Sequence, residues 1–285
     1  MLIETPVFNG QMTQEGRAAA QRDHLAQIEE ALKRFPIDLV HFHGLDFHTY
    51  VPRNGVRKLA TLHLPPAWYP ETIFHAKDLN LNCVSELQAQ SAPIREHLPV
   101  VSNGIETERY RPRPGAKEFL LWLGRICPEK GVHIALEVAH QVELPIVVAG
   151  PVHPYREHQE YFSTRVQPLL DGKRTYAGPV GLEQKAELLA TARCLLIPSL
   201  VAETSSLVAM EAISSGTPVI AFRSGALPEV VTHGMTGFIV DSQEEMREAI
   251  ARTGDISPEV CRRTAQERFD ARRMVGDYLN LYASL

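Results

Sequence analysis

The stretch 119-FLLWLGRICPEKGVHIALEVAHQVELPIVVAG-150 decides the fold, because it contains a strand, a helix and a second strand in succession. Residues 119–126 and 145–150 are short apolar runs of the kind found in buried strands. Between these runs, one helical face is apolar at i, i+3, i+4 and i+7, formed by Val132, Ala135, Leu136 and Ala139. A helix between two fully apolar strands predicts a βαβ unit with parallel strands.

The same alternation continues toward the C-terminus and predicts an α/β fold. Four further apolar runs are expected to be strands, at residues 175–180, 194–199, 218–223 and 236–240. About six parallel strands make a complete Rossmann-like domain. Helix starts are indicated by Ser242 with Glu245 three residues later, a capping box, and by Ser257 followed by Pro258.

The N-terminal part repeats this logic less regularly. A helix is expected at about residues 12–35, followed by strands at 38–44, 58–64, 79–85 and 99–104. Residues 105–117 carry many charges and two prolines, which is typical of an exposed connector between domains. The last segment has Asp270 as N-cap and one apolar stripe. We therefore expect an N-terminal domain at 1–110, a C-terminal domain at 111–268, and a final helix at 269–285 that packs back toward the N-terminal domain.

Composition excludes several classes of protein. The chain has 285 residues, of which 44% are hydrophobic and 22% charged, and a net charge of -5 without a basic run, so nucleic acid is not an expected partner. No apolar stretch approaches the roughly 20 residues of a membrane-spanning helix. Glu4 lies where a signal peptide would be apolar, so a cytoplasmic location with reduced cysteines is expected.

The residues just after each strand are the informative ones, because doubly wound sheets bind ligands at the carboxyl ends of their strands. The turn 124-GRICPEKG-131 places Arg125 and Lys130 between a strand and a helix start. Two cations on one such turn can clamp a diphosphate, to which the helix N-terminus adds backbone donors. Arg125 and Lys130 would show the same sequence pattern if they were merely solvated at the surface, so the turn alone does not establish phosphate binding.

A second turn, 203-ETSSLVAMEAISSGTPVIAF-222, follows the strand at 194–199. Ser205 and Ser206 are N-cap candidates, so amides near them would face a bound anion. Glu203 and Glu211 lie eight residues apart, about 12 Å if the span were wholly helical. Because Glu211 has apolar neighbours, recognition of hydroxyl groups explains it better than an exposed surface position does.

The histidines of 41-HFHGLDFH-48 allow a metal site, since His41 and His43 would share one face of a strand and His48 follows closely. No carboxylate or cysteine completes a ligand set at tight spacing, so no metal is expected there.

These motifs together resemble a known family. E-x7-E followed by small-Gly-x-Pro-Val, the upstream GR-x4-KG, 103-NGIETERYRP-112 and 225-GALPEVVTHGMTGFIVD-241 are similar to those of the retaining nucleotide-sugar glycosyltransferases of family 4 (group 1). The resemblance is dense from residue 99 to 285 and thin before it. It implies a GT-B fold of two Rossmann-like domains and a hexosyltransferase activity of the EC 2.4 class that requires no cofactor or metal.

The resemblance also implies roles for single residues. Arg125 and Lys130 would hold the diphosphate of the donor, Glu211 the ribose hydroxyls and Glu203 the hydroxyls of the transferred sugar. His63, at the end of the strand 58–64, would stabilise the reacting centre, so the catalytic set is His63, Glu203, Arg125 and Lys130. The donor-binding set implied is Gly124, Arg125, Lys130, Val180, Glu203, Thr204, Ser205, Ser206, Leu207 and Glu211, with Val180 lining the nucleobase.

The expected function is transfer of a sugar from a UDP- or GDP-linked donor to an unknown acceptor hydroxyl, with retention, in the synthesis of a glycan, glycolipid or small glycoside. The alternatives are a nucleotide-sugar epimerase and a non-catalytic or weakly active nucleotide-sugar-binding protein of the same fold. Compared with the family, the N-terminal domain is shortened by two βα units, on the order of 60 residues. Self-association that covers this domain, and peripheral contact with a membrane, are compatible with the sequence.

Overall fold

The computed structural model describes residues 13–285 except 95, 114 and 116, and the chain forms two compact units. The first contains the described residues up to Val84, together with Gln88–Val100 and Asn280–Leu285. The second contains Ser85–Leu87 and Val101–Leu279. The sequence predicts a functional domain boundary between residues 110 and 111. The division into compact units does not test that boundary, which stays a prediction.

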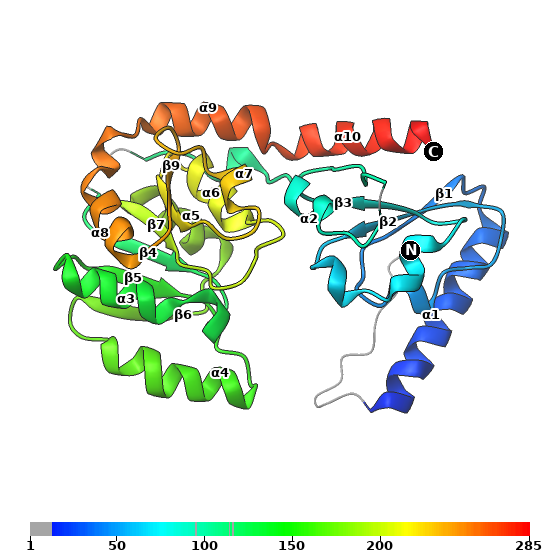
Figure 1. Ribbon diagram of the computed structural model, residues 1–285, viewed down its shortest axis with the longest axis horizontal. Coiled ribbons are helices and arrows are strands. Elements are labelled where there is room, and N and C mark those ends of the chain that lie inside the picture. Colours follow the sequence, from blue (N-terminus) through cyan, green and yellow to red (C-terminus); the bar gives the residue numbers. More distant parts are fainter. Residues whose placement is uncertain (1–12, 95, 114, 116) are drawn as a thin grey trace. The chain divides into compact units, whose positions relative to one another are not determined.

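The second unit is built on a six-stranded parallel sheet with the order β6-β5-β4-β7-β8-β9 (Figure 1). Its strands are β4 (Leu120–Leu123), β5 (Ile146–Ala149), β6 (Arg174–Gly178), β7 (Cys194–Ile197), β8 (Val219–Phe222) and β9 (Gly237–Val240). All six predicted strands are confirmed. In chain order the arrangement is third, second, first, fourth, fifth, sixth, which is the Rossmann order, and it reverses direction between β4 and β7.

Helices cover both faces of this sheet. They are α3 (Val132–Gln141), α4 (Arg156–Tyr161), α5 (Leu182–Thr191), α6 (Leu207–Ser214), α7 (Leu227–Val230), α8 (Gln243–Ala251) and α9 (Pro258–Arg268). α3 and α8 contact each other and the sheet, whereas α5 and α6 pack together, with α6 against β7 and β8. All residues of β4 and β7 are therefore buried, which explains why those strands are apolar throughout rather than alternating.

Side-chain caps begin several helices where the sequence predicts them. The hydroxyl oxygen of Ser242 accepts from the Glu245 N–H, and that of Ser257 accepts from the Val260 N–H. The capping box is only half formed, because the Glu245 carboxylate accepts from the Asp241 N–H instead of from Ser242. The carboxylate thus stabilises the residue before the cap.

Gly131 explains the glycine of the GR-x4-KG motif. It ends the short 3₁₀ helix η5 (Pro128–Lys130) with φ 65° and begins α3. A Cβ atom there would lie 2.1 Å from the Pro198 carbonyl oxygen. The backbone conformation and the close approach of β7 both require glycine.

The first unit holds a three-stranded parallel sheet in the order β1-β2-β3. Its elements are α1 (Gln14–Arg34), β1 (Leu39–Phe42), β2 (Arg57–Leu62), β3 (Asn80–Cys83) and the short α2 (Glu86–Gln90). α1 begins and ends close to the predicted residues.

The predicted strand at 99–104 is wrong. Only one bridge forms, between Val100 and Cys83, and the chain then leaves the sheet. The carbonyl oxygens of Ser102 and Asn103 accept hydrogen bonds from the Arg273 guanidinium, so they are not available for a strand ladder.

Arg273 belongs to α10 (Ala271–Ser284), which Asp270 caps by accepting from the Arg272 N–H. The predicted cap is confirmed. Among the residues that the structure describes, no helix combines the length and apolarity that crossing a membrane needs.

Candidate functional site

A cavity of about 730 Å³ opens in the second unit at the reversal of strand order, between the ends of β4 and β7. This volume suits a ligand the size of a nucleotide sugar. Its lining is Trp122, Leu123, Gly124, Arg125, Lys130, Ala149, Gly150, Pro151, Pro179, Val180, Lys185, Leu196, Ile197, Glu203, Ser205, Ser206, Leu207, Val208 and Glu211.

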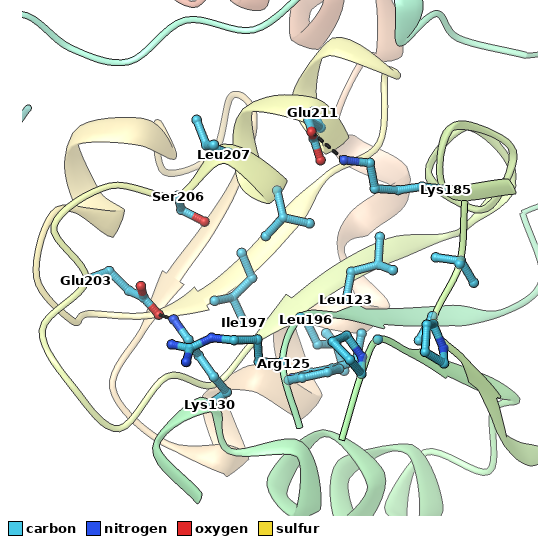
Figure 2. Close-up of a pocket in the computed structure, with 18 of the residues that line it drawn as sticks. Leu123, Arg125, Lys130, Lys185, Leu196, Ile197, Glu203, Ser206, Leu207 and Glu211 are labelled. Carbon is cyan, nitrogen blue, oxygen red and sulfur yellow. Dashed lines mark hydrogen bonds and ion pairs between the residues drawn. The ribbon is translucent and has the colours of Figure 1, made fainter. Parts of the chain in front are cut away.

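One end of the cavity carries two cations and a carboxylate (Figure 2). The Lys130 ammonium lies 2.5 Å from the Glu203 carboxylate, which also accepts a hydrogen bond from the Ser199 hydroxyl at 2.7 Å. The Arg125 side chain is exposed and forms no ion pair with any described residue. Arg125 thus retains an unpaired positive charge with which to bind an anion.

The start of α6 provides further donors. Ser206 is its N-cap and accepts from the Ala209 N–H, so the preceding amides, of Leu207 and Val208, have no carbonyl acceptor within the helix. The buried Ser205 hydroxyl faces the same cavity and has no hydrogen-bond partner among the described residues. An anion in this place would satisfy all three donors.

The other end of the cavity holds Glu211, whose side chain is only 10% exposed. Its carboxylate accepts from the Tyr110 hydroxyl at 2.8 Å and lies 2.6 Å from the Lys185 ammonium, as Figure 2 shows for Lys185. Burial alone would lower the pKa of Lys185, but the bonds to Glu211 and Tyr110 outweigh it and raise that pKa. Glu211 is a buried, oriented carboxylate and not a surface residue.

Nine of the ten residues predicted to bind the donor line this one cavity, all except Thr204. Glu203 precedes α6 and is not part of it, so the separation expected for a wholly helical span does not apply. The predicted exposed connector at 105–117 is wrong in part, because Ile105, Thr107 and Tyr110 are buried.

Sequence reasoning missed Lys185 and Tyr110. Lys185 lies three residues after Leu182 and four before Leu189, so it shares a helix face with two leucines, and a cation on such a face is a signal that could have been noticed. Nothing in the sequence marks the partner of Tyr110.

The predicted catalytic His63 lies in the first unit, where it contacts His43, whose ring in turn lies near that of His41. The His63 and His43 rings share a hydrogen bond of 2.9 Å, and His41 bonds the Thr61 and Tyr282 hydroxyls, each at 2.7 Å. His48 instead lies on the 3₁₀ helix η1 (Phe47–Thr49). Burial lowers the pKa of His63 and His43, and burial with the two neighbouring rings lowers that of His41 to about 4. All three rings are neutral near pH 7.

Residues 117–254 match the family model of the group 1 glycosyl transferases. Within the second unit, these residues form a group 1 glycosyl transferase domain. The matched segment contains the whole charged lining of the cavity, which is Arg125, Lys130, Lys185, Glu203 and Glu211.

Two curated relatives illustrate the similarity of this glycosyltransferase domain. The sulfoquinovosyl transferase SQD2 of Arabidopsis thaliana is 29% identical over 217 residues, 68% of this chain and 41% of SQD2. The MMP alpha-(1->4)-mannosyltransferase of Mycolicibacterium hassiacum is 36% identical over 155 residues, 52% of this chain and 36% of that protein. The chain thus spans about two fifths of these relatives in the aligned parts.

Solved glycosyltransferase structures share the fold of both units. Sucrose-phosphate synthase from Thermosynechococcus elongatus has a TM-score of 0.79 at 18% identity, covering 96% of this chain and 81% of that one. Anabaena HepE in complex with UDP-glucose has a TM-score of 0.76 at 18% identity, covering 92% and 82%. The fold is GT-B, with a six-stranded sheet in the glycosyltransferase domain and three strands in the first unit.

The histidine cluster predicts a pH dependence of stability. The unfolded chain protonates His41 below about pH 6.5, whereas the folded chain does so only near pH 4. The unfolded state therefore binds more protons between these values, and the free energy of unfolding falls as the pH falls through this window. His41→Gln should lose less stability than the wild type between pH 7 and pH 5 in urea titrations.

The control is His75→Gln, which changes a histidine whose side chain is 63% exposed and should leave the pH dependence as in the wild type. An unchanged pH slope in His41→Gln would contradict the neutral, half-buried state assigned to His41.

Proposed function

We propose that the chain transfers a sugar from a nucleotide diphosphate donor, linked to UDP or GDP, to an acceptor hydroxyl with retention at the anomeric carbon. The observation that carries the proposal is the cavity at the β4 and β7 ends, where cations and a helix start lie at one end and an oriented carboxylate at the other. This is the distribution of charge that a nucleoside diphosphate complements.

In the proposed complex the diphosphate lies against Arg125, Lys130 and the start of α6. Lys130 is already paired with Glu203, and in the proposed complex a phosphate oxygen replaces the carboxylate at the ammonium group. The exchange releases Glu203 to accept hydrogen bonds from the sugar hydroxyls. One ion pair thereby couples binding of the phosphates to recognition of the sugar.

The nucleoside occupies the remaining lining. Glu211 accepts from the ribose hydroxyls while Lys185 and Tyr110 hold it in place. Val180, with Trp122 nearby in the lining, offers apolar surface to the nucleobase. An uncompensated carboxylate would be costly to bury, and these two partners offset that cost before a ligand arrives.

The chemistry follows from the charge that develops on the leaving group. The bond between the anomeric carbon and the phosphate oxygen breaks, a glycosidic bond forms on the same face, and the acceptor proton passes to the departing phosphate oxygen. Arg125, Lys130 and the α6 amides stabilise the diphosphate as this charge grows. No enzymic nucleophile is assigned, and His63 is given polar stabilisation near the reacting centre on the family resemblance alone.

The cations of the protein take the place of a metal at the diphosphate, so in this proposal the donor needs no divalent ion. We also propose that the reaction takes place in the cytoplasm, where thiols such as the four free cysteines stay reduced. The alternative is a weakly active nucleotide-sugar-binding protein, which would share the cavity but lack turnover.

Transfer itself is tested by incubating the chain with UDP- and GDP-sugars, a panel of sugar and lipid acceptors, and no added metal. We expect a new glycoside whose anomeric configuration, read by NMR, equals that of the donor. Inversion would contradict the mechanism. Epimerised donor would indicate an epimerase, and binding without product on any acceptor would favour the alternative.

The phosphate contacts predict the effect of removing Lys130. A charge-assisted hydrogen bond contributes about 1.5–3 kcal/mol, so Lys130→Met should weaken UDP or GDP binding roughly tenfold or more in calorimetry without divalent ions. Lys173→Met, at an exposed site outside the cavity, is the matched control and should bind as the wild type does. Equal affinity of both variants would refute the assignment.

The two carboxylates should act on different parts of the donor. Glu211→Gln should weaken binding of the free nucleotide, because the ribose loses a charged acceptor. Glu203→Gln should preserve or improve it, because Lys130 no longer has a competing carboxylate, and should lose selectivity among donor sugars. Calorimetry with UDP and several UDP-sugars separates these effects, and a loss of equal size in both variants would show that the division of roles is wrong.

A further inference from the structure

Three metal-ligating side chains converge outside the donor cavity. The ligand atoms of Cys127, Glu129 and His158 all lie within 4.8 Å of one another. None of the three residues lines the cavity at the ends of β4 and β7. The cluster is therefore a separate feature of the glycosyltransferase domain.

Two structural elements bring these side chains together. Cys127 and Glu129 belong to the turn between β4 and α3, and the backbone carbonyl of Glu129 accepts from the Leu200 N–H at 2.8 Å. His158 projects from α4, 31 positions along the chain from Cys127 by their numbers (158 − 127). The turn is held against the sheet, so the position of the first two side chains is fixed by the fold.

His158 brings a buried polar atom without a hydrogen-bond partner to this cluster. Its side chain is buried, with a relative exposure of 9%, and its Nδ1 atom has no hydrogen-bond partner among the described residues. Leaving a buried polar nitrogen unsatisfied costs about 1–3 kcal/mol. A buried thiol and a carboxylate lie close enough to this imidazole to complete a ligand set.

We propose that Cys127, Glu129 and His158 bind one zinc ion. Sulfur, nitrogen and carboxylate oxygen together are a donor set typical of zinc, whereas magnesium and calcium prefer oxygen alone. Zinc bonds of about 2.0–2.3 Å require the ligand atoms of one ion to lie within a few Å of one another, and these atoms already lie within 4.8 Å. Water takes the fourth position, on the partly exposed side of Glu129.

Zinc binding changes the protonation state of Cys127. In the metal-free chain the Cys127 sulfur carries its proton at neutral pH, as an ordinary thiol does. Zinc binds the thiolate, the neutral imidazole and the carboxylate, and one proton is released to solvent.

The role of such an ion would be structural. Cys127 and Glu129 lie between Arg125 and Lys130 in the chain, so zinc would tie the turn that carries both cations to α4. It would hold the phosphate-binding side chains in place without contacting the donor.

The test measures metal content rather than activity. Untagged protein is incubated with zinc chloride, desalted and analysed for zinc, and about one equivalent per chain is expected. Cys127→Ser and His158→Ala should each lower the retained zinc at least tenfold. Cys261→Ser, which alters an equally buried thiol elsewhere, should retain it.

Two further measurements distinguish a loss of zinc binding from a failure to fold. Glu129→Gln alters a partly exposed side chain of the same size, and it should weaken zinc binding roughly tenfold against a competing chelator while melting normally without metal. Cobalt in place of zinc should give a thiolate-to-cobalt charge-transfer band that Cys127→Ser lacks. Wild-type protein that holds no more zinc than a folded Cys127→Ser, equal retention in every variant, or the absence of that band would overturn the proposal.

Discussion

The pairing of β4 with β7 is the constraint on which the site depends. These strands are in register only through Leu120 with Cys194 and Leu121 with Leu195. Beyond this point Leu123 pairs with Ala149 of β5 and Ile197 pairs with Ala221 of β8, so the carboxyl ends of the two central strands are not bridged to each other. The cavity occupies this opening, and the chain that follows each strand supplies its charged walls.

The electrostatics of the cavity follow from the same geometry. Four charged groups of the cavity form two ion pairs, Lys130 with Glu203 and Lys185 with Glu211. Arg125 forms no ion pair with any residue that the structure describes. The pairs keep partly buried charges compensated in the empty site, which limits the cost of desolvation. The two ion pairs also differ in their proposed roles. The donor breaks the pair of Lys130 with Glu203, whereas it binds Glu211 while the pair of Glu211 with Lys185 stays intact.

Much of this architecture could be predicted from the sequence. The six strands of the glycosyltransferase domain follow from apolar runs, and Ser206, Ser242 and Ser257 cap helices because short polar side chains satisfy free amides locally. These are interactions between near neighbours in the chain.

What could not be predicted depends on contacts between distant residues. Tyr110 and Lys185 reach Glu211 from segments 101 and 26 residues away. The sequence of residues 99–104 predicts a strand, but the carbonyl oxygens of Ser102 and Asn103 accept hydrogen bonds from Arg273 instead. Cys127 and His158 carry no recognisable metal-binding spacing, because the fold rather than the local sequence brings them together.

A crystal structure of the chain with bound UDP or GDP would test most directly how the cavity binds a diphosphate. We expect the diphosphate to lie at the carboxyl ends of β4 and β7, to contact Arg125, Lys130 and the amides at the start of α6, and to have displaced Glu203 from Lys130. A nucleotide bound elsewhere, or one that leaves the ion pair between Lys130 and Glu203 intact, would contradict this expectation.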